Sequence, residues 1–215
     1  MYDFGLRFEG EHGLKKLGYK GACLVKPFNK WIDYVKAKDE LSSYYLLGVE
    51  LKPKSIKDLI NQSRQFKDTD YLTINNPSRK IFRAAVEKGL VDSISGIELI
   101  KEPDRIHQRA TLLDKANAKF MANNKVSMVI EFANLKRSYG MRRAMLWGRM
   151  KYNAWICIKK KVPIIIASGA SNPNELIDSE ILKSFAQLLG MNAGQAKQSL
   201  SYVQEKILLR EKNLN

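Results

Sequence analysis

The sequence is poor in the residues that build disulfide frameworks and metal centres. It has only two cysteines, Cys23 and Cys157, and two histidines, His12 and His107, among 215 residues. Two cysteines are too few for a disulfide framework or a cysteine-rich metal site, so we expect a reduced, cytoplasmic protein. The sequence also has no apolar run near the roughly 18 residues of a membrane span. Because its first residues lack the charged start and apolar core of a signal peptide, we expect no contact with a membrane.

Acidic residues are scarce in the middle of the chain. The whole sequence has 37 Lys and Arg against 22 Asp and Glu, a formal net charge of +15. Residues 101–161 account for most of this excess, with 15 basic and 4 acidic residues. Such a block is either a solvated face or the contact surface for a polyanion. Its confinement to one segment favours nucleic acid as the partner.

Linkers rich in proline, glycine or serine are also absent, so we expect residues 1–215 to form a single domain. Short apolar segments with strand character alternate with longer segments of helical period. The predicted strands are residues 1–8, 21–26, 45–51, 71–75, 93–97, 126–132 and 162–167. The predicted helices are residues 11–17, 30–38, 55–66, 77–88, 105–122, 140–160, 178–189 and 193–210. This alternation is typical of a parallel sheet covered by helices.

Seven predicted strands in one series favour an irregular TIM-like α/β barrel, and an open doubly wound sheet is the alternative. Asn76 and Pro77 predict the start of one helix, as its N-cap and first helical residue. Lys88 and Gly89 predict the end of that helix. In either fold, ligands bind beyond the carboxyl ends of the strands, so candidate functional residues are those that follow each strand.

Three cations follow the predicted strand at 71–75. Arg79 and Arg83 lie four residues apart, and Lys80 lies three residues before Arg83, so all three fall within the first turns of a helix. Amide groups at a helix N-terminus favour anions. The cluster therefore predicts a phosphate clamp, and a solvated first turn is the alternative.

The helix predicted at 140–160 has two distinct stripes. One is polar and consists of Arg142, Arg149, Asn153 and Lys160. Its members fall within about 20° of one another on a helical wheel and span about 27 Å. This stripe either follows a phosphate backbone or keeps an outer face hydrated, and we favour contact with RNA or DNA. The other stripe has the composition of a protein core and consists of Met141, Met145, Gly148, Tyr152 and Trp155.

The sequence shows no constellation typical of catalysis. Ser168 lacks the flanking glycines of a nucleophile elbow, so packing is the better interpretation of the small residues around it. Four carboxylates at strand ends are the candidate metal ligands, but no histidine stands beside them. They are Asp3, Glu50, Glu98 and Glu131. Because glycine-rich phosphate-binding motifs are absent too, we assign no catalytic and no metal-binding residue.

Short motifs along the chain resemble a known family. Residues 162–170 read VPIIIASGA, residues 189–191 read LGM and residues 195–201 read QAKQSLS. With FRAAVE at 82–87 and GLVD at 89–92, they are similar to archaeal ribonuclease P protein component 3. That family is homologous to the thirty-kilodalton protein subunit of eukaryotic RNase P. The resemblance extends along essentially the whole chain in order and length.

The resemblance implies a fold and a role. The fold is a TIM-like barrel related to the polymerase and histidinol phosphatase superfamily. The role is that of an RNA-binding subunit of the ribonuclease P holoenzyme, the endoribonuclease that removes the 5′ leader from precursor tRNA. The implied partners are RNase P RNA, precursor tRNA and protein component 2, a small subunit with an RRM-like fold, in a heterotetramer of two plus two.

The resemblance also bears on metals. In that superfamily a metal site begins with an Asp-x-His-x-His-like motif, whereas this chain reads Asp3-Phe4-Gly5-Leu6-Arg7. The resemblance therefore implies that the catalytic Mg²⁺ belongs to the RNA. By the same reasoning, this chain has no cofactor and is not catalytic on its own.

Several basic residues match positions where the family has residues suited to RNA contact. Lys80, Arg83 and Lys197 are three of them, and Arg142 or Arg143 aligns with a family arginine. Together with the polar stripe, the predicted RNA contacts are Lys80, Arg83, Arg142, Arg143, Arg149, Lys160 and Lys197. One loop departs from the family, because residues 177–180 read IDSE where the family often has two arginines around a proline.

Two other functions compete with an RNase P subunit. A stand-alone metal-dependent phosphoesterase of the same barrel superfamily is the main alternative, and the missing histidine ligands count against it. A DNA-binding or architectural protein would share the basic charge, but it would not explain the barrel pattern.

Overall fold

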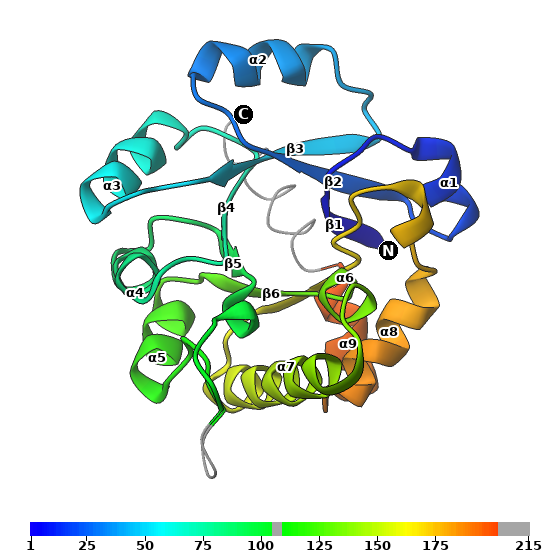
Figure 1. Ribbon diagram of the computed structural model, residues 1–215. Coiled ribbons are helices and arrows are strands. Elements are labelled where there is room, and N and C mark those ends of the chain that lie inside the picture. The colour runs from blue at the N-terminus through cyan, green and yellow to red at the C-terminus, as the bar shows by residue number, and fades with distance from the viewer. Residues whose placement is uncertain (105–108, 202–215) are drawn as a thin grey trace.

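Seven parallel strands form the wall of a barrel, and helices surround it (Figure 1). The computed structural model describes residues 1–104 and 109–201. The strands are β1 (Tyr2–Leu6), β2 (Gly21–Lys26), β3 (Tyr45–Leu51), β4 (Tyr71–Asn75), β5 (Ser93–Ser95), β6 (Ser127–Glu131) and β7 (Ile164–Ala167). Each strand pairs with the next one in the sequence. The predicted TIM-like barrel is confirmed, since the strand order of a doubly wound sheet would reverse along the chain.

The helices follow the strands and cover the outside of the barrel (Figure 1). They are α1 (Glu11–Lys16), α2 (Trp31–Asp39), α3 (Ile56–Gln65), α4 (Arg79–Lys88), α5 (Lys115–Asn123), α6 (Ala133–Lys136), α7 (Gly140–Lys160), α8 (Ser179–Leu188) and α9 (Ala193–Ser199), with 3₁₀ turns η1 (Ile97–Leu99) and η2 (Pro173–Glu175). In the described part of the chain, no helix is both long and apolar enough to cross a bilayer. Residues 202–210, predicted to continue the last helix, lie outside the described residues.

The start of α5 differs from the prediction of a helix over 105–122. Asp114 is the N-cap, and its carboxylate accepts a hydrogen bond from the Asn117 backbone N–H at 2.7 Å. Leu112 and Leu113, just before this cap, are buried without helical structure. The cap therefore begins the helix at Lys115. Residues 105–108, which include His107, lie outside the described residues.

The start of α4 was also predicted wrongly. Asn76 has a φ of 46°, whereas an N-cap residue has extended backbone. Ser78 takes the N-cap position, and the helix begins at Arg79. The predicted end of α4 is confirmed, because Gly89 closes the helix in the left-handed conformation with a φ of 60°.

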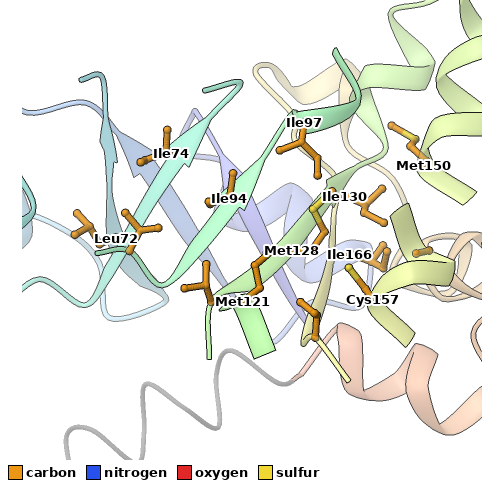
Figure 2. Close-up of a cluster of buried hydrophobic side chains, with 14 of the residues drawn as sticks. Leu72, Ile74, Ile94, Ile97, Met121, Met128, Ile130, Met150, Cys157 and Ile166 are labelled. Atoms are coloured by element: carbon orange, nitrogen blue, oxygen red, sulfur yellow. The ribbon is translucent and has the colours of Figure 1, made fainter. Parts of the chain in front are cut away.

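Side chains alternate along the strands between two hydrophobic cores. The larger core lies between the strands and the helices, where Figure 2 shows Ile130 and Ile166 of the sheet beside Met150 and Cys157 of α7. The smaller core is inside the barrel and consists of Phe4, Cys23, Val25, Tyr71, Val129, Ile165 and Ala167. Strands such as β7 are therefore apolar on both faces, as the unbroken isoleucine run predicted.

Side-chain and loop contacts join the first strand to the last. Among the described residues, no strand ladder pairs β1 with β7. Instead, the buried carboxylate of Asp3 accepts a hydrogen bond from the Ser168 backbone N–H at 2.8 Å. The backbone N–H of Arg7 donates to the Ala170 carbonyl at 3.0 Å. These contacts bring the carboxyl ends of β1 and β7 together in a nearly closed barrel. We call the end of the barrel that holds the carboxyl ends of the strands its mouth.

Candidate functional site

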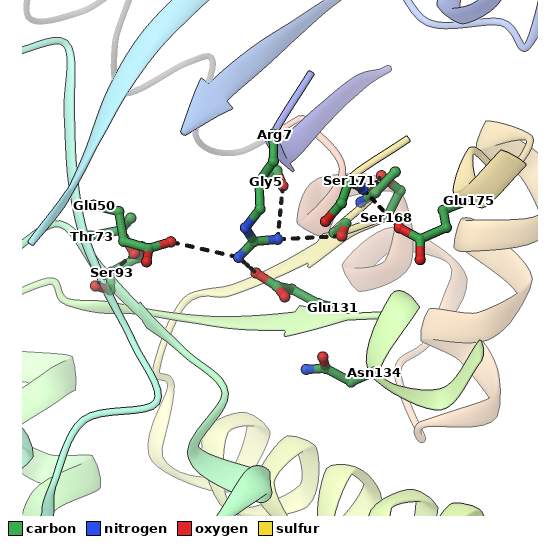
Figure 3. Close-up of polar contacts among 12 residues, drawn as sticks. Gly5, Arg7, Glu50, Thr73, Ser93, Glu131, Asn134, Ser168, Ser171 and Glu175 are labelled. Carbon is green, nitrogen blue, oxygen red and sulfur yellow. Dashed lines mark hydrogen bonds and ion pairs between the residues drawn. The ribbon is translucent and has the colours of Figure 1, made fainter. Parts of the chain in front are cut away.

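Arg7 lies in the barrel mouth, between carboxylates from two strands (Figure 3). Its guanidinium donates to the Glu131 carboxylate at 3.1 Å and lies 3.7 Å from the carboxylate of Glu50. It also contacts the backbone carbonyls of Gly5 at 3.4 Å and Gly169 at 3.3 Å. One cation therefore links the ends of β1, β3, β6 and β7.

A β-bulge at Gly5 turns Arg7 into the mouth. The register between β1 and β2 shifts between Phe4 and Leu6, and Gly5 has a φ of 86° that favours glycine. Phe4 lies in the inner core and Leu6 in the outer core, so the extra residue reverses the alternation of side chains. Arg7 consequently points inward, whereas an unbroken strand would direct it toward the helices.

Two further carboxylates are fully buried, Asp3 on β1 and Glu98 in the 3₁₀ turn η1. Burial raises the pKa of Asp3 to about 6, against the opposing effect of its hydrogen bonds with Ser168. Burial likewise raises the pKa of Glu98 to about 7, although the Asn134 amide donates to its Oε1 at 2.9 Å. Both carboxylates therefore favour the protonated form more strongly in the folded chain than in the unfolded chain. Ser168 is buried as well, in agreement with its predicted packing role.

The mouth does not fit the site of a metal-dependent hydrolase. A guanidinium cannot ligate a metal ion, and here it already pairs with Glu50 and Glu131. Within residues 1–104 and 109–201, no group of three or more His, Cys, Asp or Glu side chains is placed to hold a metal ion. The cavity beside Arg7 has a volume of about 10 Å³, which is roughly the space of one water molecule. The arrangement holds the barrel's own strands together.

The structure buries the middle of the predicted polar stripe of α7, whereas Arg142 and Lys160 at its two ends are exposed. The Arg149 side chain is only 1% exposed, and Asn153 is buried too. The Arg149 guanidinium pairs with Asp104 at 2.8 Å and donates to the backbone carbonyls of residues 98, 100 and 102 at 2.6 to 2.9 Å. The prediction that Arg149 contacts RNA is wrong, because the segment around η1 occupies its hydrogen-bonding groups.

The outer side of α7 instead presents residues predicted for the core. Met141 is 87% exposed and Trp155 is 52% exposed. Lys151 and Lys159 are exposed four residues to either side of Trp155, so the three side chains share one side of the helix. We refer to Lys151, Trp155 and Lys159 as the outer α7 face.

One sequence signal could have shown which side of α7 faces the barrel. Four apolar residues recur at intervals of four, four and three along the helix, which is the period of a buried stripe. They are Leu146, Met150, Ala154 and Cys157, and all four are buried. The stripe of methionine and aromatic residues recurs at intervals of four and three as well, so two stripes of helical period competed for the buried side.

The cations at the start of α4 are partly engaged with the chain itself. Arg79 donates to both carboxylate oxygens of Glu102 at 2.8 and 2.9 Å. Arg83 pairs with Glu87 at 3.1 Å. Lys80 is exposed and has no ion pair with a described residue. All three cations reach solvent, so RNA contact by Lys80 and Arg83 stays a prediction.

The other predicted contacts lie at opposite ends of the barrel. Arg142 and Arg143 are exposed at the start of α7, on the side of the mouth. Lys160 is exposed at the other end of α7, about 27 Å away along the helix. Lys197 lines a cavity with Met1 and other residues that precede the strands. The outer α7 face lies along the surface between these two groups.

The segment that departs from the family, residues 177–180, starts a helix. The Asp178 carboxylate caps α8 by accepting the Glu180 backbone N–H at 2.7 Å. Lys183 pairs with Glu180 at 3.1 Å on the same helix. This segment is therefore stabilised by its own polar groups.

The fold and the mouth together define a TIM-like barrel that is closed by its own ion pairs and has a strongly basic middle segment. The model of the family described as RNase P subunit p30 matches residues 12–215. The chain belongs to this family, and the resemblance seen in its motifs is confirmed.

Similar proteins agree with this assignment. The chain is 25% identical over 202 residues to ribonuclease P protein component 3 of Methanosarcina mazei, covering 92% of this chain and 80% of that protein. It is similar in fold to a chain in the cryo-EM structure of archaeal ribonuclease P with mature tRNA, with a TM-score of 0.80, 24% identity and coverage of 96% and 89%. An amidohydrolase crystal structure shares the fold with a TM-score of 0.55, 10% identity and coverage of 91% and 65%. The fold alone therefore does not decide between binding and catalysis.

Proposed function

We propose that this chain is a non-catalytic, RNA-binding protein subunit of ribonuclease P that supports the RNA in removing the 5′ leader from precursor tRNA. Membership of the RNase P subunit p30 family supports its place in the holoenzyme. The observation that carries the non-catalytic role is the ion-pair cluster of Arg7, which fills the end of the barrel where enzymes of this fold bind substrate. The chemistry then falls to the RNA, which would also bind the catalytic Mg²⁺.

The proposed partners are RNase P RNA, precursor tRNA and protein component 2 with its RRM-like fold. We propose two copies of each protein in the complex, and a location in the cytoplasm. The charge of the chain supports the RNA partners, because residues 101–161 combine 15 basic with 4 acidic residues. The structural neighbour comes from a cryo-EM structure of archaeal ribonuclease P with mature tRNA, which points the same way.

Six exposed cations are the proposed phosphate contacts. They are Lys80, Arg83, Arg142, Arg143, Lys160 and Lys197. Contacts of this kind position an RNA without reading its bases. They should therefore act alike on RNAs of different sequence, and their effect should depend on salt.

An electrophoretic binding assay with RNase P RNA and component 2, repeated over a series of salt concentrations, tests these contacts. We expect the triple variant Lys80→Ala/Arg142→Ala/Lys160→Ala to bind more weakly. The slope of log affinity against log salt should flatten by roughly 0.7 to 0.9 for each phosphate contact removed. Lys54→Ala is the matched control, because Lys54 is an exposed lysine outside the basic segment. Equal affinity and slope for the triple variant and the control would show that these cations are only solvated.

A further inference from the structure

The outer α7 face places an exposed indole between two cations. Trp155 is 52% exposed, and α7 contains no acidic residue. Neither Lys151 nor Lys159 forms an ion pair with a described residue; their ammonium groups lie near aromatic rings instead. Lys159 Nζ is 5.1 Å from the centre of the Trp155 ring, and Lys151 Nζ is 5.8 Å from that of Trp147. The face thus offers positive charge that no carboxylate of its own helix neutralises.

Tyr152 supports the indole of Trp155. The two rings stack with centroids 5.9 Å apart and an angle of 29° between their planes. A stacked neighbour restricts the rotation of the indole, so less side-chain entropy is lost when another ring binds. Trp155 is therefore an exposed aromatic surface that is already held in place.

Cations continue along the helix on both sides of Trp155. Toward the start of α7, the guanidinium of Arg109 lies against Gly148, where an added Cβ would come within 3.1 Å of it. Arg109 is half-exposed and pairs with Asp104, a carboxylate that it shares with Arg149, so this pair of arginines keeps a net positive charge. Toward the end of α7, Lys160 and Lys161 are exposed. A strand of RNA following this surface would meet positive charge before and after the indole.

We propose that an unpaired nucleobase of the RNA stacks on Trp155, while Lys151 and Lys159 contact the phosphates on either side of it. The inference rests on the proposed function and assigns one particular RNA contact to the outer α7 face. Every base has a π face, so this contact needs no particular sequence. When the base arrives, the ammonium group of Lys159 leaves the indole and contacts a phosphate, because the lysine side chain is long and flexible.

The composition of the face favours RNA over a protein partner. Lysine is depleted from the cores of protein interfaces, whereas here a lysine stands on each side of the indole. Aromatic rings beside cations are the usual surface for single-stranded RNA, because the rings stack with bases and the cations follow the backbone.

Tryptophan fluorescence tests the proposal. The sequence has three tryptophans, so Trp31→Phe/Trp147→Phe leaves Trp155 as the single reporter in this chain. Its emission is measured in complex with component 2 while RNase P RNA is added, and the same complex with Trp155→Phe added to the double variant supplies the baseline. We expect RNA to quench the emission of Trp155.

The affinity of the complex for RNA is a second measurement. We expect Trp155→Ala to weaken RNA binding about tenfold to hundredfold, whereas Trp155→Phe should retain most of the affinity. Trp31→Ala is the control on another exposed tryptophan and should change the affinity little.

Circular dichroism of each variant confirms folding before binding is measured. Unchanged emission together with wild-type RNA affinity of Trp155→Ala would overturn the inference and leave the proposed function standing. Loss of component 2 binding with intact RNA affinity would also overturn it and would show a protein-docking face. Failure of the wild-type chain to bind RNA with component 2 would overturn the proposed function together with the inference.

Discussion

Arg7 neutralises two carboxylates that come from different strands of the barrel, and Glu131 is buried beside it. The sequence predicted that the mouth lacks a histidine ligand set, because Gly5 and Arg7 stand where a metal-binding barrel would have histidines. It did not predict that Arg7 itself fills the mouth. That outcome depends on the bulge at Gly5. A glycine within a predicted strand indicates a bulge, but it does not show which side chain the bulge turns into the mouth.

We expect Arg7→Met to lower the free energy of unfolding by about 3 kcal/mol or more, because it leaves the Glu131 carboxylate buried without its cation. Denaturant unfolding monitored by circular dichroism measures the loss, and the double variant Arg7→Met/Glu131→Gln should recover part of it. Arg79→Met removes an exposed ion pair with Glu102, so it should cost less than about 1 kcal/mol. Equal losses for the two single variants would contradict a structural role of Arg7.

Glu98 should make stability depend on pH. Its pKa is raised from 4.5 to about 7 by burial, so the folded chain binds this proton more tightly than the unfolded chain. Its stabilising effect is full below pH 4.5 and is lost as the pH rises through about 7. We therefore expect Glu98→Gln to gain stability relative to the wild type as the pH rises from 5 to 8, by up to about 3 kcal/mol.

Urea unfolding of the wild type and Glu98→Gln at a series of pH values measures this difference. Glu102→Gln is the control for the loss of a glutamate carboxylate at an exposed position. A constant difference for Glu98→Gln would show that the buried carboxylate has an ordinary pKa in the folded chain.

At the scale of elements, the sequence predicted the bounds of α7 but not which of its sides faces the barrel. The bounds follow from local signals, such as the glycine at its start and the lysines at its end. The orientation depends on Arg149, whose partners lie near η1, about 50 residues earlier in the chain. Helical period indicates two stripes on α7, and this tertiary contact decides which of them faces the barrel. Local signals also gave β2, β3 and β4 with the observed bounds.

Arg149 and Lys160 were predicted to share one role, and substitution should separate them. We expect Arg149→Met to destabilise the chain by about 3 to 5 kcal/mol. The substitution removes the ion pair with Asp104 and leaves backbone carbonyls without their hydrogen-bond donor. Lys160→Met, on an exposed lysine, should change stability by less than about 0.5 kcal/mol. Thermal or denaturant unfolding compares the two, and a similar small effect for both would show that Arg149 is not a structural residue.

At the scale of the whole molecule, the inside of the barrel differs in composition from its outside. The inside is filled by apolar side chains, and the mouth is closed by ion pairs. The exposed cations and the outer α7 face are on the outside. The proposed RNA contacts therefore all lie on the exterior of the barrel. The sequence pointed to this division through its charge excess and its scarcity of histidine, while the positions of the cations required the fold.

The cleavage of precursor tRNA is the measurement that tests the central claim most directly. Labelled precursor tRNA is incubated in Mg²⁺ with the purified chain alone, with RNase P RNA and component 2, and with all three together. We predict no cleavage by the chain alone, and faster removal of the 5′ leader when it joins the RNA and component 2. Efficient metal-dependent cleavage by the purified chain alone, or no effect of the chain on the reconstituted RNA, would contradict the account.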